Sequence, residues 1–482
     1  MPVLIHRYKW ARHRNARPGR RNGGSVKTLI LIVAVLAAAP AHPWACYQGD
    51  PQHTGRSAFA VGDSFWTDWT FNAGGSISGS AVINDQGRVL FGARDVHLYC
   101  LNPDGSVAWE ADLESLGTSI YFSTPALDDA GNVYITTNRK LVKVDSTGSV
   151  LWAYPEHRSW SISHSPVIGA GGRIYFANYA DSIFAIRPDG TLDWARDLGG
   201  DCNSTPAIGP DGRVYVATTR GEGSWKLWAF EAAGATAWSF DLAAQADFSS
   251  PTVGPDTTVY VGAGRYLYAV RPDGSLRRRD SLPAVIQSSP AIADDSTLYV
   301  TAGSYLYRLS TESGVCWRKY LGGANNSAPA VDAAGRVFVG TANSDGPAIL
   351  AVAPDSTVLC SVPTVGLIWA SPAIGADGRL FVGSMNGIFY ALAGTGLGVE
   401  DPVVPGHLPF FSVAPNPTPG RLRLIGSADI ERLAIRVFDA SGRQVRYHRA
   451  GRELDLTGLP VGVYLLEARG PEGRTRSRVV LR

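Results

Sequence analysis

One short sequence pattern recurs eight times along this chain. It runs Ser-Pro-Ala-Ile or a close variant, then an aspartate-glycine turn, then Val-Tyr-Val, and the copies occupy residues 76–396. Successive copies are spaced by 44, 41, 40, 45, 39, 39 and 43 residues, measured at one anchor position: Ala81, Pro125, Pro166, Pro206, Pro251, Pro290, Pro329 and Pro372. A period near forty residues, composed only of strand patterns, predicts a propeller of four-stranded blades.

The fourth copy shows how one repeat divides. Its sequence predicts four strands, at residues 204–208, 214–216, 227–230 and 237–240. Between the first two strands, the glycine of Asp211-Gly212 supplies the positive φ that a tight turn requires. The second strand reads Val-Tyr-Val, and such an apolar run is typical of a strand that is buried on both faces.

A tryptophan recurs in the fourth strand of most copies. It is replaced near Arg278 and Cys360, and it is present at Trp109, Trp152, Trp194, Trp238 and Trp317. A large aromatic side chain at a fixed place in each blade buries much area in a narrow wedge. We therefore expect these residues to pack one blade against the next rather than to bind a ligand.

The eighth copy stops after its third strand, which we place at residues 388–392. A fourth-strand pattern instead precedes the first copy, at residues 65–71, with Trp69 in the tryptophan position. A strand from the start of the chain that completes the last blade closes the ring and removes the exposed sheet edges. The predicted fold is thus all-β, an eight-bladed β-propeller closed by an N-terminal strand.

Charge is distributed unevenly along the 482 residues. Residues 1–27 carry eight Lys and Arg and no acidic residue, residues 46–407 carry 23 basic and 35 acidic residues, a net charge of −12, and residues 408–482 carry 13 and 7, a net charge of +6. Nucleic-acid binding depends on neutralising phosphates with basic side chains. An acidic propeller therefore argues against a nucleic-acid partner.

The start of the chain has the pattern of an export signal. After the basic stretch comes an apolar run at residues 29–39, followed by small residues. The run is short for a membrane span, so we predict a signal peptide at residues 1–45, cleaved between Ala39 and Ala45, and no membrane span after cleavage. An uncleaved anchor and a lipoprotein signal ending at Cys46 are the alternatives.

The five cysteines do not indicate a framework of disulfides or a metal site. Their number is odd, their spacing is irregular, and none forms a Cys-x-x-Cys or Cys/His ligand pattern: Cys46, Cys100, Cys202, Cys316 and Cys360. We expect no metal site, and we expect most of the cysteines to be small buried residues on strands.

The only candidate binding site lies where each first strand begins, near the central axis. Three residues before the anchors, the copies carry uncharged polar or aromatic side chains, and His164 lies beside them: Phe122, Asn203, Phe248, Gln287, Asn326 and Trp369. These residues are predicted to surround one mouth of the channel. They either hydrogen-bond channel water and one another, or they bind a peptide or a sugar. No catalytic triad, phosphate loop or carboxylate pair is evident, so we assign no catalytic residues.

The blades resemble the pyrroloquinoline-quinone-like (PQQ-like) propeller repeat. The resemblance rests on the Ser-Pro-Ala-Ile and Gly-Arg-Val-Tyr-Val pieces, and on Leu-Tyr-Ala-Val followed by Pro-Asp-Gly-Ser, and it covers residues 46–396. In the quinoprotein alcohol dehydrogenases it would imply a quinone cofactor, calcium, an aspartate base and two adjacent cysteines. This chain has no adjacent cysteines and no recognisable set of calcium ligands. We therefore expect neither PQQ nor calcium as a cofactor, and a quinoprotein-like dehydrogenase is kept as an alternative.

The composition changes after residue 398. Residues 399–409 form a proline-rich linker between the propeller of residues 46–398 and a C-terminal domain at 410–482. Strand patterns at 421–425, 433–439, 453–456, 463–468 and 478–481 predict a small immunoglobulin-like β-sandwich.

This C-terminal domain is similar to the sorting domain of the type IX secretion system. The resemblance rests on pieces that contain the following residues: Pro415, Asn416, Pro417, Gly442, Gly462 and Tyr464. It implies export across the outer membrane, with the secretion machinery as a partner. A generic immunoglobulin-like accessory module is the alternative.

Together these patterns predict a monomeric protein that is secreted or held on the outer surface of a Gram-negative-type bacterium. We expect its propeller to be non-catalytic and to serve as a binding scaffold for a protein or a glycan. Besides the dehydrogenase, a scaffold for outer-membrane assembly is a further alternative.

Overall fold

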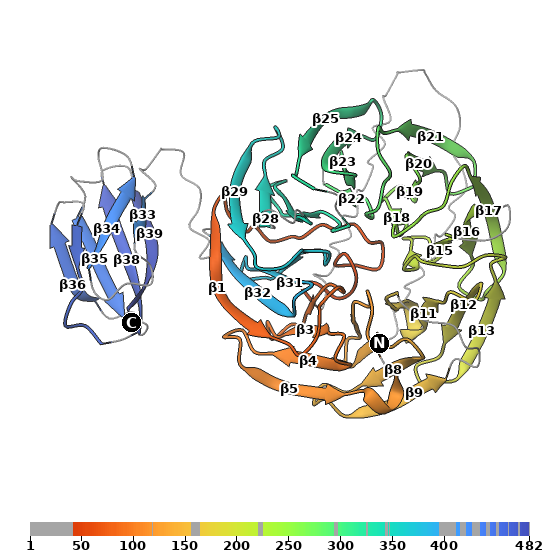
Figure 1. Ribbon diagram of the computed structural model, residues 1–482, viewed down its shortest axis with the longest axis horizontal. Coiled ribbons are helices and arrows are strands. Elements are labelled where there is room, and N and C mark those ends of the chain that lie inside the picture. Colours follow the sequence, from red (N-terminus) through yellow and green to blue (C-terminus); the bar gives the residue numbers. More distant parts are fainter. Residues whose placement is uncertain are drawn as a thin grey trace, which may run out of the picture. The chain divides into compact units, whose positions relative to one another are not determined.

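A computed structural model describes residues 42–482, except residues 118, 156–163, 220–224, 294–296, 324–325, 343–345, 347, 395–410, 415–420, 427–433, 440–443, 450–452, 461, 471–472 and 482. Eight four-stranded antiparallel sheets follow one another around a ring, as the sequence predicts (Figure 1). Most of the predicted signal peptide, the linker at 399–409, Pro415–Pro417 and Gly442 lie outside the described residues.

Blades 1 to 4 are built from consecutive strands. Their bounds are β2 (Val82–Ile83), β3 (Val89–Gly92), β4 (His97–Leu101) and β5 (Val107–Asp112); β6 (Ala126–Leu127), β7 (Val133–Thr136), β8 (Lys140–Val144) and β9 (Val150–Pro155); β10 (Val167–Ile168), β11 (Ile174–Ala177), β12 (Ser182–Ile186) and β13 (Leu192–Asp197); β14 (Ala207–Ile208), β15 (Val214–Ala217), β16 (Trp225–Phe230) and β17 (Thr236–Leu242). Two short 3-10 turns lie in this half of the ring, η1 (Glu114–Leu116) and η2 (Ala170–Gly172).

Blades 5 to 7 repeat this order, and blade 8 combines the two ends of the ring. The bounds are β18 (Thr252–Val253), β19 (Val259–Ala263), β20 (Tyr266–Val270) and β21 (Leu276–Ser281); β22 (Ala291–Ile292), β23 (Thr297–Ala302), β24 (Tyr305–Ser310) and β25 (Gly314–Tyr320); β26 (Ala330–Val331), β27 (Val337–Gly340), β28 (Ala348–Val352) and β29 (Val358–Pro363); β30 (Ala373–Ile374), β31 (Leu380–Gly383), β32 (Ile388–Gly394) and β1 (Phe65–Asn72).

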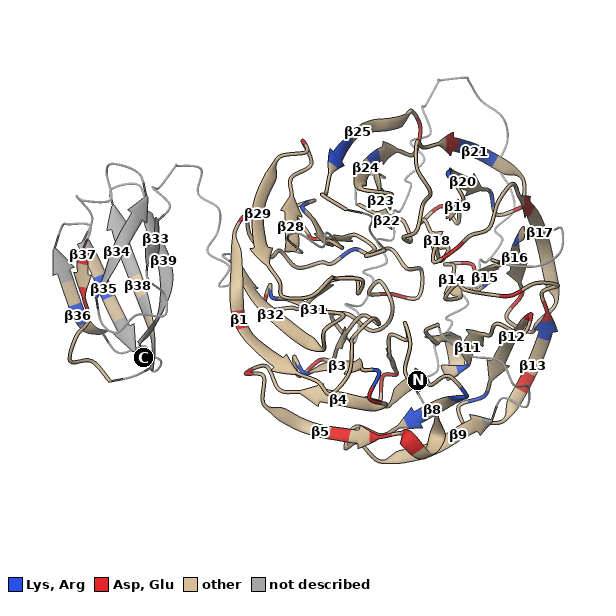
Figure 2. Ribbon diagram, viewed as in Figure 1, with Lys and Arg blue, Asp and Glu red and all other residues tan. Residues whose placement is uncertain are grey.

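The core lies between the blades. Every residue of each second strand, from β3 in blade 1 to β31 in blade 8, is buried. Charged residues lie mainly on outer strands such as β5, β13, β21 and β25 and on the hairpins (Figure 2). This division follows from the sequence, because the inner strands are apolar and the fourth strands alternate.

The ring closes as predicted. Strand β1 pairs antiparallel with β32, from Phe65 opposite Gly394 to Asn72 opposite Ile388. The side chain of Trp69 lies near Phe381 and Phe389, with ring centroids 6.1 and 6.2 Å away. Strand β1 thereby supplies the outer strand of blade 8, which would otherwise end at β32.

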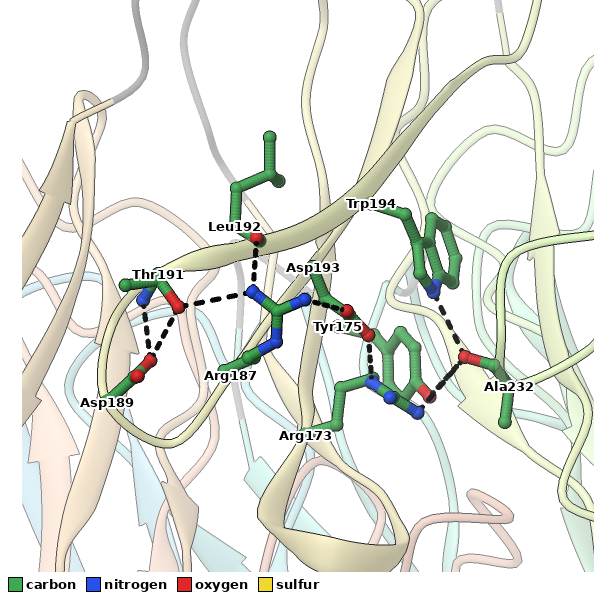
Figure 3. Close-up of polar contacts among 9 residues, drawn as sticks. All are labelled: Arg173, Tyr175, Arg187, Asp189, Thr191, Leu192, Asp193, Trp194 and Ala232. Carbon is green, nitrogen blue, oxygen red and sulfur yellow. Dashed lines mark hydrogen bonds and ion pairs between the residues drawn. The ribbon is translucent and has the colours of Figure 1, made fainter.

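Each fourth-strand tryptophan docks on the next blade. In blade 3, the indole N–H of Trp194 donates to the carbonyl of Ala232 in blade 4 at 3.0 Å (Figure 3). Equivalent bonds of 2.8 to 3.1 Å are made by Trp69, Trp109, Trp152, Trp238 and Trp317. The expectation that these residues pack blade against blade is thus met.

A β-bulge places each docking residue. In blade 3, Leu192 is opposite Ile186 and Trp194 is opposite Ala185, so Asp193 is the extra residue. The same irregularity occurs in the outer strand pair of every other blade, including β1 with β32. A bulge turns a side chain locally, and here it turns the indole towards the neighbouring blade.

The segment before β1 crosses the channel. Its backbone carbonyls, from Trp44 to Gly55, accept hydrogen bonds of 2.7 to 2.9 Å from the last residue of six inner strands: Ile83, Leu127, Ile208, Val253, Ile292 and Val331. Trp44 is 1% exposed and His42 is 5% exposed. Among the described residues, His42 and Trp44 thus contact the blades although they precede the boundary expected at Cys46.

All five cysteines are free. Cys46, Cys100 and Cys202 are buried, whereas Cys316 is exposed and Cys360 is partly buried. Cys360 takes the tryptophan position of blade 7, and its thiol donates to the backbone carbonyl of Phe65 on the closing strand at 3.4 Å.

The C-terminal domain contains two sheets. One holds β33 (Phe411–Ala414), β34 (Arg421–Gly426) and β37 (Glu453–Asp455); the other holds β36 (Gln444–Arg449), β35 (Ala434–Asp439), β38 (Gly462–Gly470) and β39 (Gly473–Leu481). The strand β36 was not expected from the sequence, because its arginine-rich pattern resembles a loop. Gly462 begins β38, and Tyr464 donates from its hydroxyl to the carbonyl of Pro460 at 2.7 Å.

The closing strand offers a matched test of ring closure. Replacing Trp69 by alanine removes the ring contacts and the bond to the Pro103 carbonyl, and should lower the free energy of unfolding by about 3–5 kcal/mol. Trp66→Ala on the same strand removes a side chain that is 38% exposed and should cost less than about 1 kcal/mol. Denaturant unfolding measures both, and equal losses would contradict the docking role of Trp69.

Candidate functional site

A ring of hydrogen bonds surrounds the channel one residue before each anchor. The backbone N–H of one blade donates to the hydroxyl of the next blade, as Thr205 does to Ser250 at 2.9 Å. Six further bonds of this kind, of 2.8 to 3.4 Å, involve Ser80, Thr124, Ser165, Ser289 and Ser371. Ala328 has no hydroxyl and so interrupts the ring between blades 6 and 7. These hydrogen bonds hold the first strands of neighbouring blades together. They therefore also position the mouth residues that precede those strands.

Three aromatic side chains lie together at the channel mouth. The ring of Phe122 is 6.1 Å from Trp369, nearly parallel to it, and 5.4 Å from Phe248 at a steep angle. All three are only partly buried. Phe248 has a φ of +59°, a backbone conformation that a bulky residue rarely adopts. Such strain costs of order 1–3 kcal/mol and persists where the surroundings hold the residue in place.

A polar network extends from this group. His164 stacks on Phe122 at 6.3 Å and its Nε2 hydrogen-bonds the side-chain oxygen of Asn203. The Tyr179 hydroxyl donates to the same oxygen at 2.7 Å, and the Asn203 amide donates to Asp247 at 3.1 Å. Burial lowers the pKa of His164 to about 4, and the bond to Asn203 offsets only part of this effect. His164 is therefore neutral at physiological pH.

The structure brings most of the predicted mouth residues to one cavity. Phe122, His164, Phe248, Asn326 and Trp369 line it, and Asn203 bonds to His164. Gln287 does not line this cavity, although it is only partly buried.

Sequence reasoning missed the floor of the cavity. Tyr47, from the segment that crosses the channel, lines it and bonds to Ser289 through its hydroxyl at 3.0 Å. No repeat pattern includes Tyr47, so only its place in the folded chain reveals it. Ser78, which lies three residues before the first anchor as the mouth residues do, also lines the cavity, and within the described residues its buried hydroxyl has no partner.

The mouth does not fit a quinone cofactor. Its cavity measures about 40 Å³, close to the volume of one water molecule, whereas sites for drug-sized ligands measure about 300–1,000 Å³. Within the described parts of the chain, no group of three or more His, Cys, Asp or Glu side chains is arranged to hold a metal ion. These residues provide neither the space for the quinone nor the oxygen ligands that calcium requires.

In the same described residues, no helix is long and apolar enough to cross a membrane.

The closed ring of repeated blades, most of which dock on the next blade through a tryptophan, places this protein in the class of closed repeat propellers. A family model described as outer membrane protein assembly factor BamB matches residues 58–159, 141–284 and 226–356, more than half of the chain. The chain therefore belongs to this family of PQQ-like repeat propellers. Residues 412–482 match a second model, the secretion system C-terminal sorting domain, which confirms the sorting tail and indicates a secreted or cell-surface protein.

Solved structures agree on the fold. A europium-containing methanol dehydrogenase aligns with a TM-score of 0.62 at 12% identity, covering 73% of this chain and 98% of that chain. BamB from Moraxella catarrhalis aligns with a TM-score of 0.56 at 14% identity, covering 68% of this chain and 99% of that one. At such identities the likeness concerns the fold alone. A comparison with curated proteins found no match.

Two buried histidines predict acid sensitivity. Burial lowers the pKa of both His53 and His164 to about 4 from the ordinary value of 6.5. Between pH 6.5 and 4 the unfolded chain therefore binds protons that the folded chain does not. Each histidine should cost roughly 3 kcal/mol of stability across this range, and no cost is expected above it.

The variant His53→Asn tests this expectation. The asparagine amide can replace the bond from Nδ1 to the Pro251 carbonyl, and asparagine tolerates the φ of +59° at this position. When the pH is lowered from 7 to 4.5, the melting temperature should fall less for His53→Asn than for the wild type. His97→Gln, at a partly exposed site, serves as the control. Identical pH slopes for His53→Asn and the wild type would contradict the assignment.

Proposed function

We propose that this protein is an exported, non-catalytic propeller that binds a protein or a glycan at its channel mouth. The observation that supports this proposal is the group of three partly buried aromatic rings, Phe122, Phe248 and Trp369, which line a cavity of about 40 Å³ at the channel mouth. Aromatic side chains that remain partly exposed provide large contact area to a ligand at low entropic cost.

The surroundings of the rings fit a ligand with both apolar and polar groups. Asn203 and Asp247 offer an amide and a carboxylate beside Phe248. Since the cavity below has room for little more than water, the ligand contacts the mouth from outside and does not enter the channel. A segment of a protein or the end of a glycan would satisfy this geometry.

A role as an outer-membrane assembly scaffold is a second candidate. It is favoured by one observation, the match of the repeats to the family model described as an outer membrane assembly factor. The sorting tail favours the first candidate, since a chain delivered outside the cell leaves the compartment in which such assembly would occur.

Binding at the mouth can be tested with a double variant. Wild-type protein is screened against a glycan array and a peptide library, and any ligand found is titrated. Phe248→Ala with Trp369→Ala should weaken that ligand on the order of a thousandfold, because buried aromatic contacts at binding sites are worth about 2 kcal/mol each, about 4 kcal/mol together. Trp66→Ala, which removes an exposed ring on the outer strand β1, should leave binding unchanged.

Two results would contradict the proposal. One is a ligand that binds the double variant as tightly as the wild type. The other is alcohol-dependent dye reduction by the purified protein after reconstitution with PQQ and calcium, which would support the dehydrogenase alternative.

The sorting tail makes a separate prediction. A reporter fused to residues 405–482 should reach the cell surface or the medium in a host that has the type IX system. The same fusion without the last strand, β39 (Gly473–Leu481), should stay in the periplasm, because β39 is the edge strand paired along the whole of β38. Cell fractionation distinguishes the two locations, and periplasmic retention of the complete fusion would count against sorting.

A further inference from the structure

A second and larger cavity lies between blades 1 and 2. It measures about 340 Å³, which falls in the range of small-ligand sites. Blade 1 contributes Asp85, Arg88 and Trp109 to its lining, and blade 2 contributes Asp129 and Ser146. Asp85 and Asp129 follow the ends of the first strands β2 and β6, whereas the mouth residues precede the first strands, so the cavity is on the opposite side of the ring from the channel mouth.

Arginines at the position of Arg88 usually bridge two blades. Arg173 donates to the Ala232 carbonyl of blade 4 at 3.1 Å, beside the indole N–H of Trp194 (Figure 3). Arg213 likewise donates to the Pro272 carbonyl of blade 5 at 2.9 Å. Arg379 bonds to the Pro103 carbonyl of blade 1, and Arg336 pairs with Asp63, just before the closing strand. In each case the guanidinium is hydrogen-bonded or ion-paired to another part of the ring.

Arg88 makes no such bridge. Its Nε donates to Asn102 in its own blade at 3.2 Å, and within the described residues its two terminal nitrogens have no partner. The equivalent carbonyl in blade 2, that of Ser146, accepts only from Trp109, at 2.9 Å. The bulge residue beside Trp109 is Ala108, whereas Asp193 at that place in blade 3 holds Arg173. The junction of blades 1 and 2 is thus left open, with free donors in it.

In a mature chain cleaved before residue 42, within the window predicted above, His42 supplies a second unused polar group. It lines the cavity, is 5% exposed, and bonds through Nε2 to the Asp128 carbonyl at 3.0 Å. Since a carbonyl accepts, Nε2 carries the proton and Nδ1 is left as an acceptor. That buried Nδ1 has no partner. A buried polar group without a partner is costly, so a ligand that supplies a donor there is favoured.

We propose that this cavity is a binding site for a small polyhydroxylated ligand, the size of one sugar unit. Its lining combines donors on Arg88 with acceptors on His42, Asp85 and Asp129, beside the indole of Trp109. Hydroxyl groups both donate and accept, so one sugar can satisfy this mixed set without carrying charge. The site is distinct from the channel mouth and does not depend on the function proposed for it.

Ligand-observed NMR on the full chain provides the test. The probes are free monosaccharides, namely neutral hexoses, N-acetylhexosamines and uronic acids, with free amino acids as comparison ligands. At least one monosaccharide should bind, and Arg88→Ala should weaken it about tenfold or more, because bonds from a charged donor contribute strongly to affinity. Ala130→Trp, which places a bulky side chain at an exposed position of the lining, should also abolish binding.

Arg213→Ala is the matched control. It removes the arginine at the same position of blade 4, where the guanidinium bridges to blade 5, so it should lower the melting temperature and leave sugar binding unchanged. Arg88→Ala should weaken sugar binding and change the melting temperature little. Phe248→Ala with Trp369→Ala should keep sugar binding, which separates this site from the mouth.

The proposal is overturned if no monosaccharide binds, if only the amino acids bind, or if sugar binding survives both Arg88→Ala and Ala130→Trp.

Discussion

The hydrogen bond from a fourth-strand indole to a carbonyl of the next blade is the contact on which this ring depends. A propeller blade has little surface of its own to bury, and its stability comes from its neighbours. Each indole fixes the distance and angle between two blades, as Trp194 does with Ala232. Six blades use it, and the two junctions without it rely on other groups, such as Cys360 beside Phe65.

The repeat explains why the fold could be predicted and parts of the site could not. The spacing of the anchors and the position of Trp69 are local patterns, so ring closure followed from the sequence. The segment around Tyr47 bonds to the blades largely through its backbone carbonyls, so the sequence does not show which side chain, here the hydroxyl of Tyr47, reaches the cavity. The expectation for Gln287 assumed eight equivalent positions, but the structure leaves it off the cavity. The repeat specifies an arginine at this position but not whether its guanidinium reaches the next blade: Arg88 bonds within its own blade, whereas Arg213, also in a blade with alanine at the bulge, bridges to Pro272.

The two faces of the ring are used differently. At one end the hydroxyl ring and the aromatic group leave a small cavity of about 40 Å³. On the other face, a space of about 340 Å³ lies at the junction of blades 1 and 2, where Arg88 makes no bridge. Both follow from departures from the repeat, since its regular positions are occupied by packing. Function in such a fold is therefore sought where a blade differs from its neighbours.

The pairing of Phe65 with Gly394 also has a kinetic consequence. An exported chain emerges N-terminus first, yet both β1 and the segment crossing the channel find their partners only after the later blades have arrived. Such non-local pairing gives a high contact order and slow folding. Until then β1 and the edge of β32 stay unpaired and prone to aggregation. The closed ring is thus a late product of export, and a holding chaperone in the envelope would shield these unpaired strands during the period of greatest risk.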